Sequence, residues 1–193
     1  VSGAAPARAA WLPNVLGSFH ASHPRTGMIL REEKTEELAR LVGTGQLDLA
    51  VLHAVPGMYT GDGSQRGIVM ERLFDEELVV IVAPDHPLAH RKVIGLRDLR
   101  NEAFVLRSRG SGLAHTIMAA MTSEGFAPRV SAETVTMTSL RGLVAVGIGV
   151  SIIPQLSAMA PGPPVIFFPI LPSSPRPSAA VARAGDRQPS PAA

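Results

Sequence analysis

The stretch TEELARLVGTGQLDLAVL, residues 35–52, decides the fold of this chain. Leucine and valine recur in its first half at spacings of three and four residues, which places them on one face of an amphipathic helix. Gly43 and Gly45 follow, and glycine adopts the left-handed backbone that ends many helices. The apolar run at 47–52 is too short for a helix and, with Asp48 inside it, predicts a strand buried on both faces of a sheet. The stretch therefore predicts a helix–turn–strand unit.

Helices and strands alternate along the rest of the chain. Apolar patterning predicts helices at 6–23, 96–99, 110–124 and 138–146, and strands at 28–31, 78–83, 103–106, 128–134, 150–153, 165–170 and 178–183. A polar, glycine-rich segment at 60–67 predicts a loop. Such alternation is typical of an α/β architecture with largely parallel sheets.

Composition excludes several classes of protein. Apolar residues make up 46% of the chain, yet no apolar run approaches the roughly eighteen residues needed to span a bilayer, and no signal peptide is visible. The absence of cysteine excludes thiol catalysis, cysteine metal sites and disulfides, and fits a reducing cytoplasm. The net charge is +2, the basic residues are scattered, and there is one Trp and one Tyr. Direct binding of nucleic acid by this segment is therefore not expected.

Five motifs follow one another in an order that is typical of a known family. They are WLPNVLGSFHASHP at 11–24, ELARLVGTGQLDLAV at 37–51, ELVVIVAPDHPLA at 77–89, RGSGL at 109–113 and SLRGLVAVGIGVSIIP at 139–154. Together they cover most of the chain and resemble the effector-binding domain of LysR-type transcriptional regulators.

The resemblance implies an α/β fold of two Rossmann-like subdomains joined by two crossover strands, as in type 2 periplasmic binding proteins. Subdomain I would take residues 1–79 and 169–193, and subdomain II residues 80–168, with a small-molecule effector in the cleft between them. The resemblance also implies a bacterial, cytoplasmic regulator that forms homodimers or homotetramers and needs no cofactor. Family members begin with a winged helix-turn-helix, which this sequence does not contain, so contact with DNA is expected only through that missing domain.

Six residues are candidate effector contacts, and three of them belong to subdomain I. Thr35 stands where a helix N-cap would, and in the family a polar residue at this position hydrogen-bonds the effector. Ser2 is the hydroxyl of the loop after the first family strand, although it could equally belong to a frayed terminus. His53 follows the strand at 49–52, where it would pair with a carboxylate only when protonated, and it could also be an ordinary loop histidine.

The other three candidates, Ser108, Ser111 and Thr138, lie at the starts of two predicted helices of subdomain II. Backbone N–H groups at a helix start, together with an arginine fork from Arg107 or Arg109, would suit a carboxylate. The arginines could equally be solvated, so the two serines are favoured. Beside Thr138, Met137 and Ser139 open the next helix, and either Thr138 or Ser139 could simply be its cap. A small carboxylate and an aromatic-like metabolite are both possible effectors.

Neither a metal site nor an active site is expected. His86 and His90 have the spacing of metal ligands on a helix, but Pro87 separates them and no third ligand is near. The chain has no G-x-S-x-G elbow and no HExxH motif, so it is not expected to be an enzyme. The alternative function is that of a solute-binding component of a transporter with the same fold. The order of motifs favours the regulator.

Overall fold

The structure is a computed structural model that describes residues 11–33, 35–52, 68–108, 112–171 and 175–184. The chain divides into two compact units, with Val1–Asp75 and Pro177–Ala193 in unit 1 and Glu76–Arg176 in unit 2. These divisions fall inside two strands, β2 (Ile68–Val82) and β8 (Pro175–Ala184), which therefore contribute residues to both units. The sequence predicted the divisions after residues 79 and 168.

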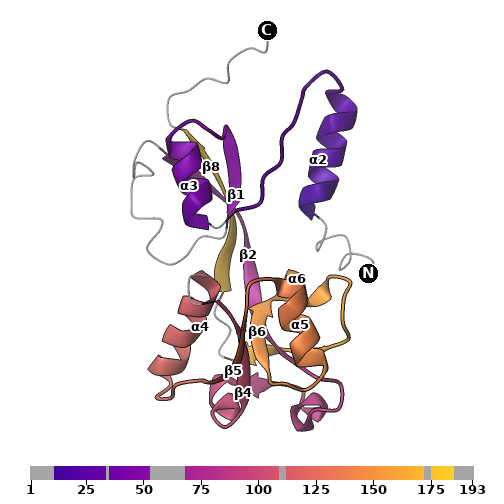
Figure 1. The fold of residues 1–193 in the computed structure, drawn as a ribbon, viewed down its shortest axis with the longest axis vertical. Coiled ribbons are helices and arrows are strands. Elements are labelled where there is room, and N and C mark those ends of the chain that lie inside the picture. The colour runs from indigo at the N-terminus through magenta and orange to yellow at the C-terminus, as the bar shows by residue number, and fades with distance from the viewer. Residues whose placement is uncertain (1–10, 34, 53–67, 109–111, 172–174, 185–193) are drawn as a thin grey trace. The chain divides into compact units, whose positions relative to one another are not determined.

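Unit 1 contains the helix–turn–strand unit predicted at residues 35–52. Helix α3 (Thr35–Gly43) lies beside β1 (Leu49–Leu52), which pairs antiparallel with β8 (Figure 1). Val42 and Ala50 are buried between them, and the partly buried residues that pack against this pair are Leu38, Ala39, Leu47 and Ile68. The predicted apolar face of α3 is thus confirmed.

The predicted glycine stop of α3 is also confirmed. Gly45 has a φ of 71°, in the left-handed region. Its N–H donates to the Val42 carbonyl at 3.0 Å, and the N–H of Gln46 donates to the Leu41 carbonyl at 2.8 Å. This is a Schellman motif, in which a left-handed glycine lets the chain satisfy the last carbonyls of a helix.

A second helix of unit 1, α2 (Trp11–Ser22), has no buried residue. The Trp11 ring meets Phe74 of β2 edge-on, with ring centroids 5.4 Å apart, whereas Val15 and Phe19 are 54% and 40% exposed. No helix in the described ranges is long and apolar enough to cross a bilayer.

Unit 2 contains a two-stranded sheet that an isolated bridge between Phe104 and Val150 joins to part of a larger sheet, so that the two form one mixed layer of strands. Strands β4 (Ala103–Arg107) and β5 (Arg129–Thr134) pair in parallel. Backbone bonds of 2.8 and 2.9 Å between Val150 and residues 103 and 105 join them to β6 (Ser151–Pro154). From there β6 pairs antiparallel with β2, β2 antiparallel with β7 (Ile166–Leu171), and β7 parallel with β3 (Ile94–Gly95).

Alternate residues of each strand point to opposite faces of this sheet, and both faces are apolar and covered by helices. One face packs Val80, Val82 and Phe104 against α4 (Gly112–Ser123). The other face packs against α5 (Met137–Ala145) and α6 (Gln155–Met159), which lie side by side in Figure 1. Two short 3₁₀ helices, η2 (Pro87–His90) and η3 (Leu96–Leu99), connect β2 to β4.

Three expectations about strands were wrong. The sheets are not largely parallel, since β1–β8, β2–β6 and β2–β7 are antiparallel. Alternation of helices and strands does not fix the direction of neighbouring strands when long strands run from one unit into the other. Residues 28–31 form no strand and are exposed, because an apolar run becomes a strand only where another strand pairs with it. Asp48 precedes β1 and is exposed, and Leu49 is 55% exposed, so β1 is not buried on both faces.

Candidate functional site

The carboxyl ends of β4 and β5 form one edge of the sheet in unit 2. Because the two strands are parallel, Arg107 and Thr134 end them at the same edge, and the Ser108 N–H donates to the Thr134 carbonyl at 2.8 Å. Helices α4 and α5 each begin a few residues beyond these strand ends. Ligands of open α/β sheets bind beyond the carboxyl ends of the strands, so this edge is the candidate site of unit 2.

The first turn of α5 is capped by Thr136. Its hydroxyl accepts a hydrogen bond from the Ser139 N–H at 3.1 Å and donates to the Ser139 hydroxyl at 2.9 Å. The expectation that Thr138 or Ser139 caps this helix was therefore wrong. The T-x-x-S pattern at 136–139 was the available signal, because an N-cap side chain bonds the N–H three residues later.

Thr138 is left free by this arrangement. It is exposed, and its hydroxyl has no hydrogen-bond partner among the described residues. The N–H groups of Met137 and Thr138 lie in the first turn, where no carbonyl of the same helix is available to them. The first turn of α5 thus offers a hydroxyl and two backbone donors at the positive end of the helix dipole.

Ser108 and Arg107 lie at the same edge, and both are half-buried. The backbone of Ser108 is held against β5, whereas its hydroxyl makes no hydrogen bond within the described part of the chain. Thr134 beneath them is buried, and its hydroxyl donates to the Thr136 carbonyl at 3.3 Å. The edge therefore combines fixed backbone with side chains that can still accept a partner.

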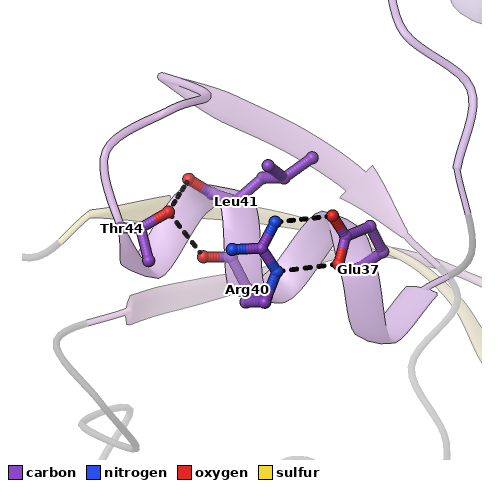
Figure 2. Close-up of polar contacts among 4 residues, drawn as sticks. All are labelled: Glu37, Arg40, Leu41 and Thr44. Carbon is purple, nitrogen blue, oxygen red and sulfur yellow. Dashed lines mark hydrogen bonds and ion pairs between the residues drawn. The ribbon is translucent and has the colours of Figure 1, made fainter.

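In unit 1, Thr35 is the first residue of α3. Figure 2 shows the polar side of this helix, where Arg40 donates to both carboxylate oxygens of Glu37 at 2.6 and 2.8 Å, and Thr44 donates to the Arg40 and Leu41 carbonyls. The hydrogen bond and the charge of Arg40 lower the pKa of Glu37, and the same pair raises the pKa of Arg40. Because both side chains are exposed, this pair is a solvated surface feature.

The candidates divide according to what the structure describes. Ser108 and Thr138 come together at one edge of unit 2, and Thr35 lies in unit 1. Ser2, His53 and Ser111 fall outside the described residues.

His86 has a structural role. It is the N-cap of η2, with Nδ1 accepting from the Leu88 N–H at 3.2 Å and Nε2 lying 3.5 Å from Glu102 Oε2. Within the described ranges, no three His, Cys, Asp or Glu residues are grouped so as to hold a metal.

Comparison with known proteins identifies relatives over nearly the whole chain. The family described as the LysR substrate binding domain matches residues 3–193. The transcriptional dual regulator GltC of Bacillus subtilis (strain 168) is 34% identical over 144 residues, which are 75% of this chain and 46% of GltC. The chain thus spans about half the length of the curated relatives it matches.

Two solved structures share the fold. The C-terminal domain of a probable LysR family regulator from Rhodococcus sp. RHA1 has a TM-score of 0.78 at 25% identity, covering 93% of this chain and 86% of that one. The effector binding domain of QuiR in complex with shikimate has a TM-score of 0.79 at 26% identity, covering 96% and 86%. The predicted fold of a LysR effector domain is thereby confirmed. The relatives are regulators of transcription, which favours the first predicted function over the transporter component.

Proposed function

The chain belongs to the family of LysR substrate-binding domains, and we propose that it binds a small carboxylate as effector. We further propose that binding controls transcription through a DNA-binding domain elsewhere in the full-length regulator. The observation that carries this proposal is the set of donors at the carboxyl edge of β4 and β5 that have no partner among the described residues. The Thr138 hydroxyl and the first N–H groups of α5 are neutral donors, and the Ser108 hydroxyl lies at the same edge.

The chemistry of these donors favours an anion. Backbone N–H groups at a helix start bind carboxylates without bringing a buried positive charge of their own. Arg107 is half-buried at the same edge and adds positive potential. The QuiR domain, which shares the fold, is described in complex with shikimate, which is a carboxylate. A carboxylate is therefore favoured over an uncharged metabolite.

The remaining contacts of the proposed site follow the family pattern. Thr35 would contribute from the start of α3, and Ser2, His53 and Ser111 from loops. A protonated His53 would add charge to the carboxylate contact, so affinity would rise as the pH falls towards the ordinary imidazole pKa of about 6.5.

We also propose that the full-length regulator acts in the bacterial cytoplasm as a homodimer or homotetramer and catalyses no reaction. The exposed apolar side chains of α2, Val15 and Phe19, support a second copy as partner, because a helix with no buried residue has an apolar stripe left to cover. Contact with DNA would come from the other half of the protein, so a mobility shift with this domain alone at physiological salt should show no binding to duplex DNA.

A thermal-shift and calorimetry screen of small carboxylates tests the proposal. Shikimate, benzoate and short aliphatic acids are compared with their uncharged methyl esters, and an acid that binds should raise the melting temperature while its ester does not. A hydrogen bond to a charged group contributes about 1.5–3 kcal/mol, so Thr138→Ala should weaken binding of such an acid roughly 10- to 100-fold. Without ligand its melting temperature should be unchanged, since the hydroxyl bonds no other residue in the part of the chain that the structure describes.

The matched control is Thr122→Ala. Thr122 is another exposed helical threonine, in the last turns of α4, and its hydroxyl bonds the Met118 carbonyl at 2.9 Å. This variant should bind the acids as the unaltered chain does. Thr35→Ala should likewise weaken binding, since Thr35 is the proposed contact at the start of α3. If no acid raises the melting temperature, or if Thr138→Ala binds undiminished, the proposed site is wrong.

A further inference from the structure

Helix α6 (Gln155–Met159) has only five residues and is too short to be stable alone. Its N-terminal end is held by a side chain far away in the sequence, since the Leu156 N–H donates to Glu76 Oε1 at 2.8 Å. Glu76 is 6% exposed and is the first residue of unit 2, within β2. A carboxylate at this end also suits the positive end of the helix dipole.

Arg141 of α5 holds the opposite end of α6. Its Nη1 donates to the carbonyls of Ser157 and Ala160 at 3.1 and 2.5 Å, and its Nη2 donates to the Pro163 carbonyl at 2.9 Å. The side chain is buried, and burial lowers the pKa of its guanidinium. An arginine still stays protonated at neutral pH, so its charge is set against the negative end of α6.

The space between these two ends is closely packed. Ala158 of α6 is buried in the same cluster as Val79 of β2 and Val144 of α5. Gly162 lies over the guanidinium of Arg141, where a Cβ would come within 3.3 Å of Nη1 and 3.4 Å of Cζ. Helix α6 is therefore fixed to β2 at one end and to α5 at the other.

Arg141 lies one helical turn after Thr138, so the three carbonyl bonds that hold Arg141 also set how α5 is rotated about its axis. We propose that Glu76 and Arg141 are positioning residues that make α6 a rigid link between the start of unit 2 and the first turn of α5. The inference rests on the proposed function only because the first turn of α5 is part of the edge at which the effector is proposed to bind. A disturbance at Glu76 then reaches the donors of that edge without any contact between them.

Amide hydrogen exchange on the full chain without ligand tests this link. In Glu76→Ala, exchange should rise at the Leu156 amide and also at the Leu140 amide, which donates to the Thr136 carbonyl in the first turn of α5. The expected rise at Leu140 is about fivefold, the factor that corresponds to one net hydrogen bond. Glu76→Gln keeps an acceptor oxygen for Leu156 and should restore most of the protection.

The Val105 amide, bonded to the Val150 carbonyl at 2.9 Å in the centre of the sheet, is the internal reference and should not change. Arg97→Gln is the matched control, because it removes an arginine from an exposed pair with Glu124 in the same unit and should leave Leu140 unchanged.

Two results would overturn the proposal. Faster exchange at Leu156 with no change at Leu140 would show that the Glu76 bond stabilises only the start of α6 and does not affect α5. An equal rise at Val105 would mean that Glu76 supports only the stability of the whole unit. If Glu76→Ala does not fold, Gly162→Ala takes its place, since its Cβ would press the Arg141 guanidinium by a few tenths of an ångström and should raise exchange at Leu140. Unchanged exchange at Leu140 in this variant would remove Arg141 from the link. No effector is used, so failure of the carboxylate screen leaves this result intact.

Discussion

Gly149→Ala should destabilise the chain more than the same substitution at Gly142 or Gly147. A Cβ at this position would lie 2.5 Å from the oxygen and 2.9 Å from the carbon of the Ala103 carbonyl, where an ordinary contact is 3.4–4 Å. The backbone of Ala103 cannot yield freely, because the Val150 N–H donates to the same oxygen at 2.8 Å. Overpacking of this kind costs about 1–3 kcal/mol, and loss of a buried hydrogen bond adds about 1–3 kcal/mol. The free energy of unfolding should therefore fall by about 2–6 kcal/mol.

Two glycines of the same motif provide matched controls. Gly147 has a φ of 80° with nothing within 4 Å of an added Cβ, so Gly147→Ala should cost only the left-handed backbone, about 1–2 kcal/mol. Gly142 lies inside α5 with equally open space, so Gly142→Ala should stabilise the chain by about 0.5–1 kcal/mol.

Urea unfolding followed by circular dichroism measures the three variants side by side. Trp11, the single tryptophan, lies in unit 1 and reports that unit separately by fluorescence. A Gly149→Ala variant as stable as Gly147→Ala would refute the reasoning, because it would show that the close approach of β4 to the Gly149 backbone carries no cost.

Three further predictions concern α3 and α5. Val42 is fully buried, so Val42→Ala should lower the free energy of unfolding by about 2 kcal/mol in urea titrations, and a cost near zero would contradict the core of unit 1. Arg40 lowers the pKa of Glu37. The ion pair should therefore stabilise the fold above the ordinary carboxylate pKa, and this stabilisation should be lost as the pH falls through the lowered pKa of Glu37. In Arg40→Gln the pKa of Glu37 measured by NMR should rise, and an unchanged pKa would exclude the pair. Thr136→Ala should cost about 1 kcal/mol as loss of the α5 cap, whereas a larger cost for Ser139→Ala would reverse their roles.

Much of the fold was predictable because local chemistry determined it. The apolar face of α3 and the left-handed Gly45 follow from residue type and spacing alone. Strand direction was not predictable in this way, since it depends on how β2 and β8 run between the two units. The first half of β2 was missed for a related reason: Glu71 and Asp75 interrupt its apolar pattern, and only pairing with other strands makes it extended.

The candidate site was predictable in outline only. The sequence placed Ser108 and Thr138 at the starts of two helices, and the parallel pairing of β4 with β5 brings those helix starts to one edge. The cap at Thr136 was not predicted because three hydroxyl residues, at 136, 138 and 139, lie close together and composition alone does not show which of them precedes the helix. Glu76 and Arg141 left no local pattern at all, since their partners are distant in sequence and are backbone groups, which any residue supplies.

The motif at 139–154 shows why the family can be recognised when the effector cannot. Gly147 is required by a left-handed backbone, and Gly149 by the close approach of Ala103. The buried hydroxyl of Ser151 donates to the Val105 carbonyl at 2.6 Å, and Arg141 binds only backbone carbonyls. Each of these constraints comes from packing within unit 2 and not from a bound molecule. We therefore expect the effector to be distinguished by side chains that have no partner among the described residues, such as Thr138. Exchanging that side chain should change affinity before it changes stability.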